Sequence, residues 1–280
     1  MSQLSFEFLA LTFVAYLIAT FLFTAYLRNL SWSFAKLARW FLAFGLLLHL
    51  GELFTLLHAS GHYFPTNSQT SLLTVTALIS AICFFLSFRK SRLILIVILL
   101  PMISAALVAL YFISDASAAT ALPSPWLWTH ILSILLGEAL FCLAAASSII
   151  YLVVESRLKH RQVSKFFARV PALPDIDKFL NELLSVGFAL LSLGMLLGFF
   201  FAREYWSPGW ILDPKVLFCL LTWLVFAFIL IFRIVSKSFR GRRSSQATVL
   251  GFVLIVFLTW GVDFFFHSQH QNFRIENKNP

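Results

Sequence analysis

The chain has 280 residues, of which 60% are hydrophobic and only 12% are charged. Because a soluble domain of this size carries about 25% charged residues, the composition excludes an ordinary soluble domain and indicates a membrane protein. Lys and Arg number 21 against 12 Asp and Glu, which gives a net charge of +9. The three cysteines, Cys83, Cys142 and Cys219, have no CxxC spacing, so the sequence predicts no disulfide framework, zinc site or redox pair.

Long, nearly uncharged stretches recur along the whole chain, and each is close to the ~20 residues that a helix needs to cross a bilayer. They predict an all-α, polytopic membrane helical bundle of about eight transmembrane helices, formed as a single integral membrane domain over residues 1–280. The first stretch has no basic start and no small-residue cleavage site, so we expect it to remain as a membrane helix. The expected spans are Phe6–Leu27, Leu37–Leu57, Ser71–Phe88, Leu93–Ile113, Trp126–Val154, Phe179–Ala202, Val216–Phe232 and Ala247–Phe266.

The basic residues are divided unevenly between the two sets of loops. One set holds 17 of the 21 Lys and Arg, while the other set and both termini hold Arg203, Lys215, Arg274 and Lys278. The positive-inside rule then predicts that both termini lie outside, in a multi-pass protein of the bacterial cytoplasmic (inner) membrane. The net charge therefore has a topological origin and does not indicate nucleic acid binding, although the basic loops can also contact anionic membrane lipid. The 17 inside residues are Arg28, Lys36, Arg39, Arg89, Lys90, Arg92, Arg157, Lys159, Arg161, Lys165, Arg169, Lys178, Arg233, Lys237, Arg240, Arg242 and Arg243.

The short outside loop between the sixth and seventh spans concentrates unusual residues. It contains Trp206 and Trp210, four residues apart, and then the turn Asp213-Pro214-Lys215. Aromatic faces, one anion and one cation at a membrane edge suit a flat, amphipathic ligand that bears carboxylates, and haem is such a ligand. The alternative is that these tryptophans only belong to the aromatic belt at the membrane interface.

Two histidines at outside ends of spans flank this loop in the sequence. His130 lies five residues into the fifth span, and His267 lies at the end of the eighth. Because neutral imidazoles can bind haem iron from opposite faces, we predict that His130 and His267 are the iron ligands. The outside cations Arg203 and Lys215 are suited to pair with the haem propionates.

Four polar residues are expected within the membrane: His49, Glu52, Glu138 and Asp263. Ionisable groups at this depth are costly and are therefore functional candidates. His49 and Glu52 are three apart on one helix face, and Asp263 lies four residues before His267, where it can support that ring. Hydrogen bonding between helices is the alternative role for each residue.

These motifs resemble the cytochrome c assembly family of tryptophan-rich, haem-handling membrane proteins (the CcsA, CcmC and HemX type). The residues Trp206, Trp210, Asp213, Pro214 and Lys215 match the family's outside loop in order and spacing. His130 and His267 match its two flanking histidines, and the segment 61–67 resembles its Gly-His-Phe-Pro loop, which makes His62 a ligand of a second, membrane-level pair. The resemblance covers about residues 61–268. The chain departs from the pattern at Ser207 and Leu212, and it has Ile231 where the partner of His62 is expected.

The resemblance implies a protein that holds haem b at the outer face and presents it during cytochrome c maturation. Partners would be other cytochrome c maturation proteins, and thioether formation would need one of them, so we expect a haem-handling assembly factor more than an enzyme. The chain has no CxxCH acceptor and is not itself a c-type cytochrome.

Two alternatives remain open at this stage. The short length and the departures in the loop are closest to the HemX/YpjD-like branch, which implies a regulator of haem biosynthesis at the level of glutamyl-tRNA reductase. Such an enzyme would contact the basic inside segment Glu155–Lys178. The other alternative is a secondary transporter with a proton path through His49, Glu52 and Glu138.

Overall fold

The computed structural model describes residues 3–29, 32–59, 64–65, 68–89, 92–112, 125–161, 170–206 and 209–257. Within these residues the chain forms eight α-helices and two short 3-10 helices, which confirms the all-α fold. The elements are α1 (Gln3–Asn29), α2 (Trp32–Ala59), α3 (Ser68–Leu86), α4 (Leu93–Phe112), α5 (Pro125–Lys159), α6 (Leu173–Tyr205), η3 (Trp210–Leu212), α7 (Pro214–Val235), η4 (Lys237–Phe239) and α8 (Arg242–Val256).

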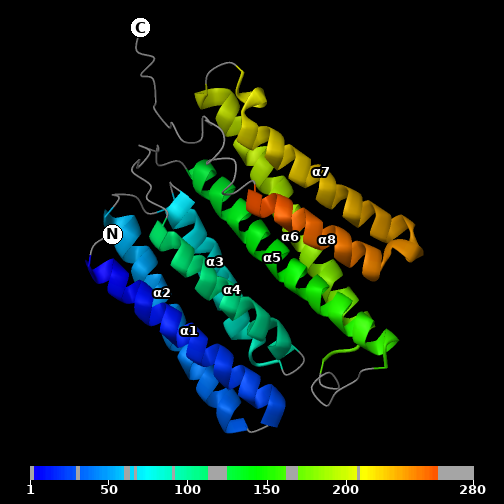
Figure 1. The fold of residues 1–280 in the computed structure, drawn as a ribbon. Helices are drawn as coiled ribbons and strands as arrows, with labels where there is room; N and C mark the ends of the chain where they lie inside the picture. Colours follow the sequence, from blue (N-terminus) through cyan, green and yellow to red (C-terminus); the bar gives the residue numbers. More distant parts are fainter. Residues whose placement is uncertain are drawn as a thin grey trace.

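The helices lie side by side as a bundle, and consecutive helices run in opposite directions (Figure 1). The most extensive contacts join α5 to α6 and α1 to α2, and α5 also packs against α3, α4 and α8. Among the described residues, six helices are long and apolar enough to cross a membrane: α1, α2, α3, α5, α6 and α7. The apolar part of α4 is shorter, over Leu93–Ala109, and α8 has 15 residues. The chain is therefore a multi-pass membrane protein.

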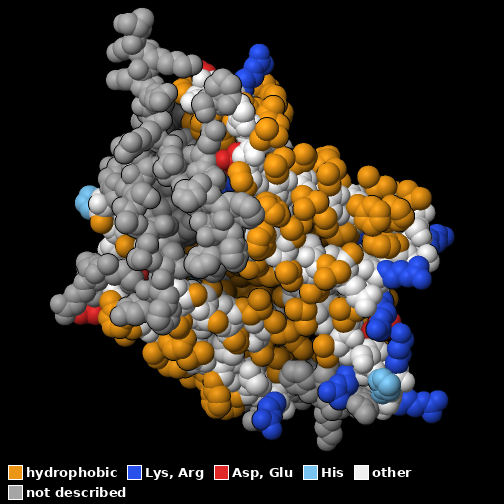
Figure 2. Space-filling view, turned by 45° about the horizontal axis from the view of Figure 1, so that its top comes forward, with side chains coloured by type: hydrophobic (Ala, Val, Ile, Leu, Met, Phe, Trp, Pro, Cys, Tyr) orange, Lys and Arg blue, Asp and Glu red, His pale blue; other side chains and the backbone are white. Residues whose placement is uncertain are grey.

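The surface agrees with this conclusion. Figure 2 shows hydrophobic side chains over most of the described surface in that view, while Lys and Arg lie mainly along its right and lower edges. Large apolar residues such as Phe21, Phe85 and Val235 are more than two-thirds exposed, which suits a lipid environment. The alternating helix directions bring the basic helix ends together, for example those of α5 and α7. The opposite end of the bundle carries the loop between α6 and α7.

Several helix boundaries lie a few residues away from those that hydrophobicity predicts, and two of them have a clear local cause. Helix α5 continues beyond Val154 to Lys159, because its charged last turn stays helical and Lys159 pairs with Glu155 at 3.0 Å. Helix α6 begins at Leu173 instead of Phe179, because Pro174 is favourable in a first turn and Asp175 complements the helix dipole there. The ends of the basic segment 155–178 are therefore extensions of α5 and α6.

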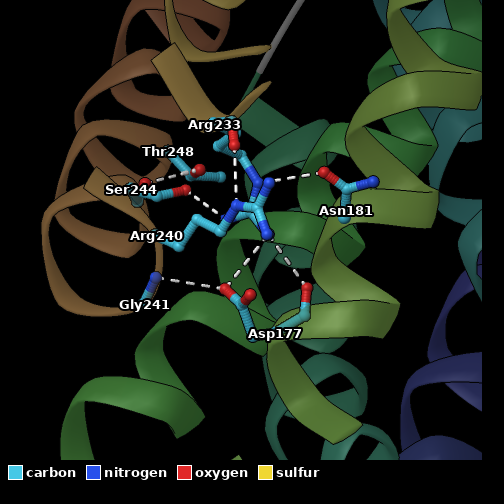
Figure 3. Close-up of polar contacts among 7 residues, drawn as sticks. All are labelled: Asp177, Asn181, Arg233, Arg240, Gly241, Ser244 and Thr248. Atoms are coloured by element: carbon cyan, nitrogen blue, oxygen red, sulfur yellow. Dashed lines mark hydrogen bonds and ion pairs between the residues drawn. The ribbon is translucent and has the colours of Figure 1, made fainter. Parts of the chain in front are cut away.

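A buried arginine fastens three helices at the basic end (Figure 3). Arg233, near the end of α7, is only 3% exposed. Its guanidinium donates to Asn181 Oδ1 at 3.0 Å and to the Asp177 carbonyl at 3.1 Å, both on α6, and to the Ser244 hydroxyl on α8. It also forms an ion pair with Asp177 Oδ1 at 3.1 Å, and this oxygen accepts the Gly241 N–H at 3.2 Å. This cluster of Arg233, Asp177, Asn181 and Ser244 is called the inner clamp below.

Candidate functional site

The loop between α6 and α7 is built from short local turns. The backbone N–H of Trp206 donates to the Ala202 carbonyl at 3.0 Å and ends α6. Gly209 has a φ of 98°, a left-handed conformation that a residue without Cβ adopts at no steric cost. The turn is followed at once by η3 (Trp210–Leu212), which leads into α7.

Asp213 starts α7 as its N-cap. Its Oδ1 accepts the backbone N–H of Lys215 at 2.9 Å, and Pro214 occupies the first turn, where a missing N–H costs nothing. The Asp213 side chain is 5% exposed. This contact is the one that the Asp-Pro turn predicts, and it fixes where the loop meets the helix.

The loop folds back onto α6 through its second tryptophan. The Trp210 ring meets Phe199 edge to face, with 5.4 Å between the ring centroids. Both Trp206 and Trp210 are half-buried, whereas Leu212 is 75% exposed. The position at which the resembled family has a further tryptophan is thus occupied here by an outward-facing leucine.

His130 is held by the backbone of α6. Its Nδ1 lies 2.7 Å from the Gly194 carbonyl oxygen, so Nδ1 carries the hydrogen and donates it. In this tautomer the lone pair is on Nε2, the nitrogen through which such a ring binds a metal. The ring of His130 is half-buried.

Gly198, one turn further along α6, makes room for this ring. A Cβ at Gly198 would lie 2.5 Å from His130 Cε1 and 2.8 Å from Nδ1. The two glycines form a Gly194-x-x-x-Gly198 pattern, which in membrane helices allows close approach. Sequence reasoning overlooked this signal, although the pattern is visible in the chain. In the structure these two glycines allow both the His130 ring and helix α5 to pack closely on α6.

A small apolar cluster lies at the same end of the bundle. Its buried members are Phe64, Leu127 and Phe201, with Trp128 packed against them. The rings of Phe64 and Trp128 lie 5.0 Å apart. The segment 64–65 therefore contacts the start of α5 and the end of α6, close in sequence to His130.

The two predicted propionate partners lie at this end too. Arg203 is exposed in the last turn of α6, and Lys215 is half-buried in the first turn of α7. Glu138, on α5, and Lys215 are both near enough to the Cys219 thiol of α7 to act on it electrostatically. Glu138 therefore belongs to the α5–α7 side of the bundle. The predicted residues His62, His267 and Asp263 lie outside the described residues, and so the proposed ligand pair stays a prediction.

His49 and Glu52 lie elsewhere, in the half formed by α1 to α4. Both are buried, at 0% and 1% exposure. His49 contacts Tyr16 of α1 and Thr76 of α3. The described residues thus place His49 and Glu52 on α2, where His49 contacts α1 and α3, whereas Glu138 lies on α5.

Comparison with known proteins identifies relatives of most of the chain. The model of the family described as "Cytochrome C assembly protein" matches residues 43–270. The chain is 31% identical to the cytochrome c biogenesis protein CcsA of Guillardia theta over 233 residues, which is 74% of this chain and 76% of that protein. It is 31% identical to CcsA of Cyanidium caldarium over 51% of this chain and 56% of that protein. It is 27% identical to CcsA of Nicotiana tomentosiformis over 76% of this chain and 78% of that protein. The chain therefore belongs to the cytochrome c assembly protein family.

Proposed function

We propose that this protein binds haem b at the outer end of α5, α6 and α7 and presents it for cytochrome c assembly. It would do so as a single membrane domain of the bacterial cytoplasmic membrane, with this end facing outward. Membership of the family supports the process, and several relatives are cytochrome c biogenesis proteins. The arrangement of His130 supports the chemistry.

The observation that most supports haem binding is the hydrogen bond from His130 Nδ1–H to the Gly194 carbonyl. Histidines that ligate metals characteristically donate their other ring N–H to a carbonyl or carboxylate, which fixes the tautomer and makes the ligating nitrogen more basic. The glycine at position 198 holds the ring against α6, because any Cβ there would overlap it. This hydrogen bond supports the proposal that His130 is an axial ligand.

Other residues at the same end of the bundle suit the remaining parts of a haem. Trp206 and Trp210 offer aromatic surface, and the apolar cluster of Phe64, Leu127 and Phe201 provides an apolar wall. Lys215 and Arg203 supply positive charge at the membrane edge, where propionates would lie. In this proposal His267 gives the second axial ligand, and bound haem supplies the iron that both imidazoles would ligate.

The experiment is an absorption spectrum of the purified protein, read at the Soret band, with variants at two positions. His130→Ala should lower haem occupancy, and added imidazole should partly restore it. Gly198→Ala should act similarly without removing the ligand. Carbon atoms in contact are about 3.5–4.0 Å apart, so the new methyl would push the ring by about 1 Å.

Two control variants separate this effect from general damage. A Cβ at Gly51 of α2 would meet Phe8 at an ordinary 3.5 Å, so Gly51→Ala tests a helical glycine with room. His160→Ala removes a histidine at the basic end of α5. Haem occupancy equal to the parent in His130→Ala and Gly198→Ala would refute the site. Loss of haem in the two control variants would refute the proposed location of the haem site.

A further inference from the structure

A cluster of buried polar residues lies in the α1–α4 half, away from the proposed haem site. It joins Tyr16 of α1, His49 of α2 and Thr76 of α3, which are all at most 3% exposed. The Tyr16 hydroxyl lies 3.1 Å from His49 Nδ1, and Thr76 Oγ1 lies 3.3 Å from Nε2. Three helices are therefore connected by hydrogen bonds at one level of the bundle.

The hydrogen atoms of this cluster can be assigned by counting donors. The Thr76 hydroxyl donates its only hydrogen to the Leu72 carbonyl at 2.8 Å, so it accepts from His49 Nε2–H. In a ring that carries one hydrogen, His49 Nδ1 is then the acceptor of the Tyr16 O–H. Both ring nitrogens of His49 are engaged.

The helix packing holds this cluster in place. A Cβ at Gly45 would lie 2.7 Å from the Tyr16 ring, so the absence of a side chain at Gly45 lets that ring pack directly on α2. The ring centroids of Tyr16 and His49 are 6.0 Å apart. Tyr16 is thus seated where its hydroxyl meets the imidazole.

Two further polar groups lie next to this cluster, one helical turn towards the outer end. Thr12 precedes Tyr16 by four residues on α1, and Glu52 follows His49 by three residues on the antiparallel α2, so the two lie at about the same level. Their exposed fractions are 0% and 1%. Thr12 Oγ1 and Glu52 Oε2 have no hydrogen-bond partner within the described part of the chain.

Within the described part of the chain, no cation faces Glu52 from the helices around it. Helices α3 and α4 contain no charged residue, and the other described titratable groups that face the cluster are Tyr16, His49 and Cys83. Elsewhere on α1 and α2, Glu7 and His58 are exposed near the outer ends, and the basic residues are at the inner end. An ionised carboxylate would therefore be buried without an opposite charge, which is strongly unfavourable.

We propose that Glu52 is an internal proton-binding site of the membrane domain, in which the carboxylic acid keeps its proton and donates it towards Thr12, directly or through a water molecule. Buried polar groups without a protein partner commonly bind such waters. The ligand of this site is a proton, and no other co-reactant is needed.

Infrared absorption spectroscopy on the full-length protein in an ester-free detergent tests this proposal through the C=O stretch of protonated carboxyls. At pH about 7, where exposed carboxyls are ionised, the parent should show this band. Glu52→Gln should abolish it, and Thr12→Val should shift it to higher frequency because a hydrogen bond is lost. Glu7→Gln, on the exposed outer turn of α1, should leave it unchanged.

Two outcomes would overturn the assignment. The first is a parent spectrum without the band, which does not depend on any variant folding. The second is a band that persists in Glu52→Gln. If such a band is lost in Glu138→Gln, the proton lies on α5. The haem spectrum of Glu52→Gln should match that of the parent, so this test and the test of the haem site fail independently.

Discussion

The inner clamp allows a test in which the two partners of one ion pair should behave unequally. Arg233 is 3% exposed, whereas Asp177 is 22% exposed. Removing the carboxylate by Asp177→Ala leaves a guanidinium buried without a counter-charge. Removing the guanidinium by Arg233→Met leaves a carboxylate that reaches water and still accepts the Gly241 N–H. We therefore expect Asp177→Ala to be the more destabilising change.

The magnitudes follow from what each variant leaves behind. Breaking a buried ion pair by removing one partner costs roughly 3–5 kcal/mol. Because Arg233 would keep its hydrogen bonds to Asn181, Ser244 and the Asp177 carbonyl, we expect Asp177→Ala to cost about 3 kcal/mol. Arg233→Met loses hydrogen bonds to Asn181 and to the buried Ser244, each worth about 0.5–1.5 kcal/mol, so we expect a cost of about 2 kcal/mol.

The measurement is the free energy of unfolding of the detergent-solubilised protein, from SDS titration followed by tryptophan fluorescence. The double variant Asp177→Ala/Arg233→Met should cost less than the sum of the single variants by about 0.5–3 kcal/mol, because neither charge is then left alone. Lys159→Met is the control, because it breaks the exposed pair with Glu155 and should change little. A larger cost for Arg233→Met than for Asp177→Ala, or strict additivity, would refute this reasoning.

Three further predictions concern topology and the loop. Reporter fusions should read inside after Lys90, Lys165 and Arg243 and outside after Ser117 and at the C-terminus; an inside C-terminus would contradict the orientation. Asp213→Asn should be mild because an amide oxygen still caps α7, whereas Asp213→Ala should lower the free energy of unfolding by about 1 kcal/mol in the same SDS titration. In haem titrations, Trp206→Ala and Trp210→Ala should weaken binding more than the Phe variants, and Lys215→Glu more than Lys215→Gln. Equal affinities across those loop variants would assign the tryptophans to the interfacial belt.

Much of the bundle could be predicted because hydrophobicity sets the helix positions in a membrane. The predicted helix boundaries were wrong where the helices extend beyond the apolar layer, as at Lys159 and Leu173. Charged turns stay helical there because capping residues and side-chain pairs stabilise them. The Asp213 cap was predictable for a local reason, since its contact joins residues two apart.

The contacts that could not be predicted join residues far apart in the chain. His130 and Gly194 are 64 residues apart, and only packing of α5 on α6 brings them together. Tyr16 and His49 are likewise joined by packing of α1 on α2. Arg233 was predicted simply as an inside charge, because counting basic residues in loops cannot show that one of them turns inward and is buried by α6 and α8.

Helix α6 determines the geometry of the proposed haem site, because both halves of the site depend on it. Its Gly194 and Gly198 hold the His130 ring, and one residue later Phe199 holds Trp210 of the loop. At its other end the inner clamp fixes α6 to α7 and α8, and between the two ends Ser192 accepts a hydrogen bond from Trp223 of α7 at 2.9 Å. A helix advances 1.5 Å and turns about 100° per residue, so a shift of α6 by one residue would move the histidine seat and the loop contact together. The spacing between the contacts of His130 and of the loop is thus set within one helix, and the long-range contacts serve to keep that helix in register with α5 and α7.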